Sequence, residues 1–149
     1  MRRIQALIYA GLLLCLVMAA PGLAVTINPE GSTRGNTTLT SGDGLNLGTI
    51  STTSNDRYGI HSPSYFIVNG PGGVIETWGL RAWGMFADDE STAWNLGMLS
   101  IETWGDSAHG MAASGDSEAV NWGAITTHGE NAYGMFATGS SDLANHGSI

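Results

Sequence analysis

The sequence predicts an all-β protein: a parallel β-helix, or solenoid, of about four to five short coils after an N-terminal signal peptide. One phrase recurs about every two dozen residues, Gly occurs 22 times in 149 residues, and charged residues make up only 12% of the chain. Gly has about twice its usual share and charge about half, which is typical of a turn-rich chain. A repeat this short cannot bury its apolar face alone, so successive repeats must stack.

The N-terminus has the pattern of a secretory signal. A basic start at residues 1–3 precedes an uncharged apolar run over residues 4–20, and small residues end at Ala24. We therefore assign residues 1–24 to a signal peptide that is cleaved after Ala24. An uncleaved membrane anchor is the alternative, but the run is near the lower length limit for a span and Pro21 ends it. The chain is expected to be exported through the inner membrane.

The charge balance excludes several functions. Five basic residues stand against 13 acidic ones, a net charge of -8. Without Arg2 and Arg3, three Arg remain against 13 acids, a net of -10, so we expect no nucleic-acid partner. Cys15 is the only cysteine and lies in the signal segment, which leaves the mature chain without a thiol. No metal-ligand or phosphate-loop motif is present, and we expect no metal and no cofactor.

Residues 25–45 are rich in Thr, Ser, Asn and Gly. We expect this segment to form an N-terminal cap or a degenerate first coil. A flexible spacer is the alternative that its composition allows.

The repeats begin at residue 46 and contain two phrases. The central Gly of the second phrase lies at positions 59, 84, 110 and 134. We divide the region into residues 46–68, 69–94, 95–120 and 121–144 and a partial coil 145–149. The first phrase, Asn-x-Gly-x-Ile or a close variant, begins at Asn46, Asn69, Asn95, Asn121 and Asn145, with spacings of 23, 26, 26 and 24 residues.

Each copy predicts short strands separated by turns. The segments 75–78, 101–104 and 125–128 begin with Ile and are followed by Gly, as a strand followed by a turn would be. We expect three interior columns, in which equivalent residues of successive coils lie over one another. They are Ile50, Ile75, Ile101 and Ile125; Ile60, Met85, Met111 and Met135; and Ser62, Ala87, Ala113 and Ala137.

An amphipathic helical repeat is the competing fold. Gly in every phrase, frequent Thr and Trp, and the scarcity of Lys, Arg and Glu argue against it. In the β-helix, the recurrent Asn46, Asn69, Asn95, Asn121 and Asn145 are expected to form a structural ladder of side-chain amides at one bend.

The phrases Asn-x-Gly-x-Ile, Thr-x-Gly and Ala-Tyr-Gly-Met resemble the passenger repeats of bacterial autotransporters and related surface adhesins, over about residues 46–149. The resemblance implies a right-handed parallel β-helix on the outer surface of a Gram-negative bacterium, or released from it, with a C-terminal translocator β-barrel. No barrel pattern follows Gly134. We therefore expect a truncated chain, or a partner that supplies the barrel or caps the last coil.

Aromatic residues are the candidate binding residues. Alternation from Ile75 places Trp78 outside, and Trp104 holds the same position one coil further on. Trp83 and Tyr133 belong to a second column whose orientation the Gly beside them leaves open. If outward, these rings would suit a surface glycan or a protein partner; if inward, they are core. The four His share positions with aromatic residues and are interpreted as fillers of the same columns.

Catalysis is not expected. Glu76 and Glu102 occupy the same position in successive coils, but basic residues are scarce and the other acids fall in turns. We interpret the acids as solvated turn residues rather than as a calcium site. The predicted function is an adhesin-like or spacer module of a bacterial surface protein. The alternative is the remnant of a carbohydrate-active β-helix enzyme, which would need acids gathered with Arg81 in one groove.

Overall fold

The structure is a computed structural model, and it describes residues 25–29, 31, 33–35, 37–38, 42–97 and 101–149. The predicted signal peptide, residues 1–24, lies outside the described residues, as do residues 39–41 of the predicted cap. None of the described residues belongs to a helix that is long and apolar enough to cross a membrane.

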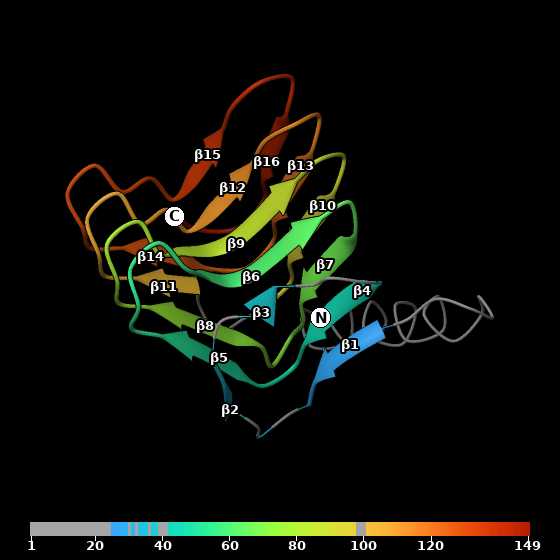
Figure 1. Cartoon of the computed structure of the whole chain (residues 1–149), viewed down its shortest axis with the longest axis horizontal. Coiled ribbons are helices and arrows are strands. Elements are labelled where there is room, and N and C mark those ends of the chain that lie inside the picture. Colours follow the sequence, from blue (N-terminus) through green and yellow to red (C-terminus); the bar gives the residue numbers. More distant parts are fainter. Residues whose placement is uncertain (1–24, 30, 32, 36, 39–41, 98–100) are drawn as a thin grey trace.

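Three parallel sheets form the molecule, and the chain visits them in turn (Figure 1). The order within each sheet advances by three strands, so each winding adds one strand to every sheet. The first sheet contains β1 (Val25–Asn28), β4 (Asp43–Asn46), β7 (Phe66–Asn69), β10 (Thr92–Asn95), β13 (Glu118–Asn121) and β16 (Asp142–Asn145). The second contains β2 (Thr33–Arg34), β5 (Thr49–Thr52), β8 (Val74–Thr77), β11 (Ile101–Thr103) and β14 (Ile125–Thr127). The third contains β3 (Thr37–Thr38), β6 (Tyr58–Pro63), β9 (Trp83–Asp88), β12 (Met111–Ala113) and β15 (Met135–Ala137).

This topology is a parallel β-solenoid, which confirms the predicted fold class. Four windings, β4 to β6, β7 to β9, β10 to β12 and β13 to β15, contribute a strand to each sheet in sequence. The short strands β1 to β3 pair below them, and β16 pairs with β13 above. The competing helical repeat is wrong, because every recurring phrase lies on a strand or in the turn beside it.

The interior columns are those that the repeat predicts. Ile75 pairs with both Ile50 and Ile101, and Ile101 pairs with Ile125. Met85 pairs in the same way with Ile60 and Met111. The rest of the core cluster includes small residues, so large and small side chains fill the space between the three sheets. The small members are Ala87, Ala93, Ala113 and Ala119. Ser62, which pairs with Ala87, is polar but also fully buried.

One corner repeats a left-handed backbone conformation in every full winding. The residue three before the central Gly has a positive φ there: 53° at Asp56, 51° at Arg81, 55° at Ser107 and 56° at Asn131. Residues other than Gly adopt this conformation seldom, mostly at tight turns. The corner joins the second sheet to the third and positions the aromatic residues on both sides of it.

Candidate binding surface

Three aromatic side chains follow the strands of the second sheet at this corner. The backbone N–H groups of Trp78, Trp104 and His128 donate to carbonyl groups of the preceding winding, at N···O distances of 2.9, 2.8 and 2.8 Å. The parallel pairing therefore continues one residue beyond the strands. Because the backbone stays in register, the three side chains lie directly over one another.

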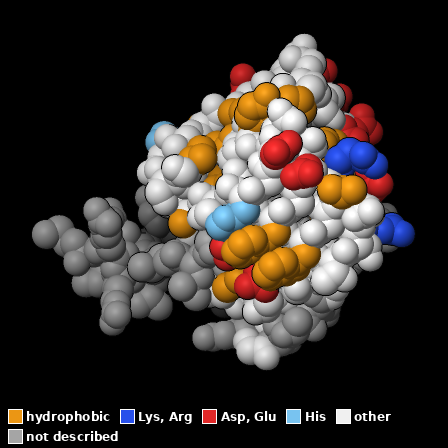
Figure 2. Space-filling model, turned by 90° about the vertical axis from the view of Figure 1, so that its left-hand side faces the viewer, with side chains coloured by type: hydrophobic (Ala, Val, Ile, Leu, Met, Phe, Trp, Pro, Cys, Tyr) orange, Lys and Arg blue, Asp and Glu red, His pale blue; other side chains and the backbone are white. Residues whose placement is uncertain are grey.

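The rings form a continuous stack on the outer surface, which we call the tryptophan stack. The ring centroids of Trp78 and Trp104 are 4.8 Å apart and the planes differ by 1°. The ring of His128 lies 3.7 Å from that of Trp104 at 10°. Trp78 is 49% exposed and Trp104 39%, which are high values for the largest apolar side chain. Figure 2 shows large hydrophobic side chains lying together beside a histidine on this side of the molecule, with acidic side chains near them.

Two carboxylates lie beside the tryptophan stack. Glu76 and Glu102 pair in register and are two residues before Trp78 and Trp104, so all four face outward. Oε1 of Glu102 lies 2.9 Å from Nε2 of His128. Within the described part of the chain, the side chain of Glu76 makes no hydrogen bond or ion pair. This edge of the stack therefore carries negative charge and free acceptor oxygens.

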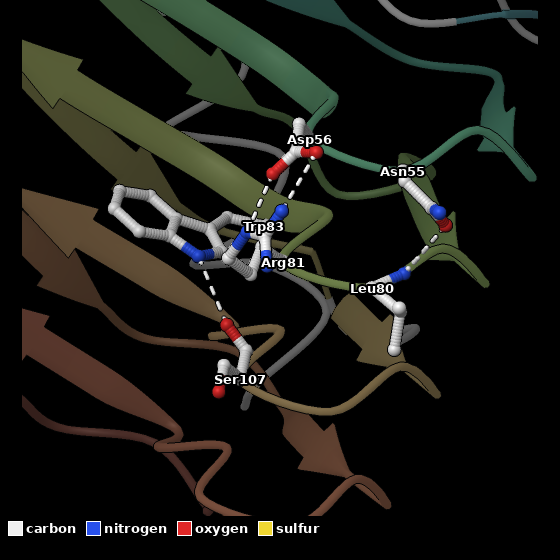
Figure 3. Close-up of polar contacts among 6 residues, drawn as sticks. All are labelled: Asn55, Asp56, Leu80, Arg81, Trp83 and Ser107. Carbon is white, nitrogen blue, oxygen red and sulfur yellow. Dashed lines mark hydrogen bonds and ion pairs between the residues drawn. The ribbon is translucent and has the colours of Figure 1, made fainter.

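The second predicted column, which contains Trp83 and Tyr133, also lies outside. Along the axis its rings follow one another in the order Tyr58, Trp83, His109 and Tyr133. The distances between successive ring centroids are 5.7, 5.2 and 5.2 Å. Tyr133 is 55% exposed, whereas Trp83 is half-buried. The indole Nε1 of Trp83 donates to the carbonyl of Ser107 at 3.1 Å (Figure 3). Trp83 thus links two windings.

A break in side-chain alternation explains the outward orientation of Trp83. Gly84 faces Ile101 in the interior, and the next residue, Met85, belongs to the core as well. Two successive inward residues shift the alternation, so Trp83 and Phe86 share the outer face, with rings 4.9 Å apart. Strict alternation from Met85 would have placed Trp83 inside. The central Gly marks the position of this break in the sequence, but it does not by itself show whether the residue before it faces inward or outward.

The same shift brings a second group of aromatic residues onto the outer face of the third sheet. The position three residues on holds His61, Phe86 and Phe136, and these rings contact the Trp83 column. His61 stacks on Phe86 at 5.1 Å and 13°, and His109 stacks on Phe136 at 4.6 Å. The outer face of the third sheet is therefore one aromatic layer whose rings contact one another. Within the described residues, the buried Nε2 of His61 has no hydrogen-bond partner.

Burial in this layer shifts the acid–base properties of its members. Burial lowers the pKa of His109, and the Nδ1 atom accepts a hydrogen bond from the backbone N–H of Tyr133 at 3.0 Å. Burial also lowers the pKa of His61, against the opposing effect of the Asp88 charge. Both imidazoles are thus favoured in their neutral form. Burial, and then the charges of Asp88 and Asp56, raise the pKa of Tyr58.

Arg81 lies at the left-handed corner and pairs with an acid of the preceding winding (Figure 3). Its Nε and second terminal nitrogen lie 2.6 and 2.9 Å from the two carboxylate oxygens of Asp56. The hydrogen bond from Arg81 lowers the pKa of Asp56. Beside this pair, Oδ1 of Asn55 accepts from the N–H of Leu80 at 3.0 Å. Arg81 is therefore bound to Asp56 and forms no ion pair with Glu76 or Glu102 in the described part of the chain.

The recurrent asparagines form a continuous chain of amide hydrogen bonds. Each Nδ2 donates to the Oδ1 of the next asparagine at 2.7 to 2.9 Å. The chain also includes Asn28 of β1, which the sequence analysis missed because Pro29, rather than an Asn-x-Gly-x-Ile phrase, follows it. The full series is Asn28, Asn46, Asn69, Asn95, Asn121 and Asn145. All but Asn145 are buried, so the ladder is part of the scaffold rather than of a contact surface.

A further exposed stack lies beyond the end of the first sheet. The imidazole of His146 lies 4.0 Å from the ring of Trp122, which is 56% exposed. The shared position of these two residues after Asn121 and Asn145 was the available sequence signal. No group of three His, Cys, Asp or Glu side chains that could hold a metal ion exists among the described residues.

The three-sheet winding, the buried amide ladder and the external aromatic stacks define a parallel β-helix repeat module. Residues 32–149, most of the chain, match the family model of the BigA third pectate lyase-like domain, and the chain belongs to this family. No curated protein and no solved structure matches the chain.

Proposed function

We propose that this chain is a non-catalytic β-helix module of an exported bacterial surface protein, which makes adhesive contacts through Trp78 and Trp104 of the tryptophan stack. The observation that carries the proposal is the tryptophan stack: two parallel, stacked indoles that are exposed to solvent and are held over one another by the backbone register of the solenoid. A large apolar surface held open to solvent is typical of a contact site. Because the backbone pairing fixes the positions of both rings, less conformational entropy is lost when a partner binds to them.

The arrangement of charge supports binding rather than catalysis. The family is described as pectate lyase-like, and pectate is a polyuronate. Such a substrate would bring many carboxylates to the protein. The chain carries a net charge of -8, and Arg81 is neutralised by Asp56. Like charges would repel such a substrate from Glu76 and Glu102. The remnant of a carbohydrate-active enzyme remains the alternative to be tested.

One experiment separates the two functions. The purified chain would be incubated with a panel of polyuronates and neutral polysaccharides, and both retention on the polymer and new reducing ends would be measured. Retention without new reducing ends is expected. Release of product from any polymer would overturn the proposal in favour of the enzyme.

Export is proposed from the first 24 residues and the acidic, lysine-free composition. The full chain would be expressed in a Gram-negative host and the N-terminus of the protein outside the inner membrane sequenced. A product that begins at Val25 is expected. A protein that retains Met1 in the inner membrane would contradict export.

A further inference from the structure

The tryptophan stack ends abruptly at Trp78. In the winding before it, Thr52 pairs with Thr77 and accepts the hydrogen bond from the N–H of Trp78, so Thr53 occupies the next position of the same column. Thr53 is exposed and its side chain is short. The spacing along the column is the 4.8 Å that separates the two indole rings. One ring-sized place in the column is therefore filled only by a threonine side chain.

Polar groups surround this place. Ser51 pairs in register with Glu76, and by alternation both lie on the outer face with Thr53 and Trp78. Ser54 is also exposed at the same corner. Hydroxyl groups and a carboxylate with free acceptor oxygens thus lie beside the face of Trp78 on which no other ring of the described residues stacks. An aromatic ring face with polar groups at its edge is suited to a ligand that has an apolar face and a polar rim.

We infer that the face of Trp78 toward Thr53 binds a pyranose ring of a neutral glycan, which takes the next place in the stack. The inference rests on the proposed function and names its ligand class and site. The apolar face of the sugar lies on the indole, and its hydroxyls bond to Ser51, Thr53 and Glu76. The neighbouring carboxylates and the net charge of -8 select against uronic and other acidic sugars.

Four forms of the chain test the inference on an array of neutral hexose and N-acetylhexosamine oligosaccharides, with polyuronates as acidic comparators. Trp78→Ala removes the platform and is expected to weaken binding by at least about tenfold. Thr53→Trp puts an indole, which the same column already accepts twice, in place of the short threonine side chain and covers this face of Trp78. It is also expected to weaken binding. Trp122→Ala removes an indole that is 56% exposed, against 49% for Trp78, from another corner and is expected to bind like the wild type.

The outcomes separate this inference from the proposed function. If Trp78→Ala and Thr53→Trp bind the glycan as the wild type does, the site is wrong although a glycan-binding module remains. If Trp122→Ala alone loses binding, the site lies at the other corner. If the wild type retains no glycan but captures a protein, or prefers polyuronates, the ligand class is wrong. If it binds nothing, the proposed function fails as well. Unchanged unfolding curves of Thr53→Trp exclude misfolding as the cause of its loss.

Discussion

Gly84 packs directly against Ile101 of the following winding. A Cβ atom built on Gly84 would overlap Cγ2 of Ile101 and would crowd the carbonyl oxygen of Gly110. The same relationship joins Gly59 to Ile75 and Gly110 to Ile125. The two recurring phrases of the sequence are thus two sides of one contact, because the central Gly of each winding makes room for the Ile of the next.

Replacing Gly84 by Ala is expected to destabilise the protein by about 2 to 3 kcal/mol, since the methyl group must displace a buried side chain and backbone. Urea unfolding measures the effect. Gly35→Ala is the matched control: no atom of the described residues lies within 4 Å of a Cβ built there, and its φ is not positive. Equal stability of Gly84→Ala and Gly35→Ala would show that the close approach does not exist.

The loss of stability on replacing a ladder asparagine by alanine is expected to depend on its position in the ladder. Asn95 is fully buried; it accepts from Asn69 at 2.9 Å and donates to Asn121 at 2.8 Å. Asn95→Ala leaves one buried N–H of Asn69 and the N–H of Gly97 without an acceptor, whereas Oδ1 of Asn121 still accepts from the N–H of Gly123. The variant is expected to cost about 3 kcal/mol. Asn145 is exposed at the last step, and Asn145→Ala is expected to cost less than about 1 kcal/mol. Thermal unfolding of the two variants checks the order; a larger loss for Asn145→Ala would contradict a buried continuous ladder.

Stability is expected to fall in mild acid. The folded state lowers the pKa of His109 below its ordinary value of 6.5, so below that pH the unfolded chain binds a proton that the folded chain does not. The stability that the neutral His109 contributes is fully present above pH 6.5. It is lost as the pH decreases from 6.5 toward the pKa of His109 in the folded state. His61 acts in the same direction.

Unfolding free energies between about pH 7.5 and pH 5 measure this dependence. His109→Tyr, which matches Tyr133 in the same column, is expected to reduce the slope. A slope that His109→Tyr does not alter would mean that this imidazole is not held neutral.

Much of the fold was predictable because each winding repeats the same constraints. The period and the recurring Ile, Met and Gly fix which residues can lie over one another, and the pairing of Ile75 with Ile101 follows. The boundaries within the first windings were less predictable, because β2 and β3 have two residues each and lack the recurring phrases. The bounds of β2 and β3 depend on their backbone pairing with β5 and β6, which the local sequence does not reveal.

The candidate site was predictable in part. Alternation from Ile75 indicated that Trp78 and Trp104 lie outside, and the shared position of His128 indicated the third ring. The orientation of Trp83 was not predictable, because it depends on two successive inward residues, Gly84 and Met85, which no period-two pattern contains. The pairing of Arg81 with Asp56 depends on left-handed backbone at both residues, which composition alone does not reveal.

The interior is expected to be intolerant of charge. Ile101 is fully buried, and Ile101→Asp is expected to abolish the cooperative unfolding transition, since an unpaired carboxylate would replace a hydrocarbon side chain in the core. Glu130 is exposed, and Glu130→Gln is expected to be nearly silent. Circular dichroism during heating compares the two, and similar melting curves would contradict the interior column.

The most direct measurement of the stacked windings is contact between isoleucine methyl groups in solution. In methyl-labelled protein, nuclear Overhauser effects are expected between Ile75 and Ile101 and between Ile101 and Ile125, neighbours about 4.8 Å apart along the axis. The pair Ile75 and Ile125, two windings apart, is expected to give a much weaker effect. Absence of both neighbouring effects, with Ile101 contacting residues outside its column instead, would contradict the solenoid and the tryptophan stack that depends on its register.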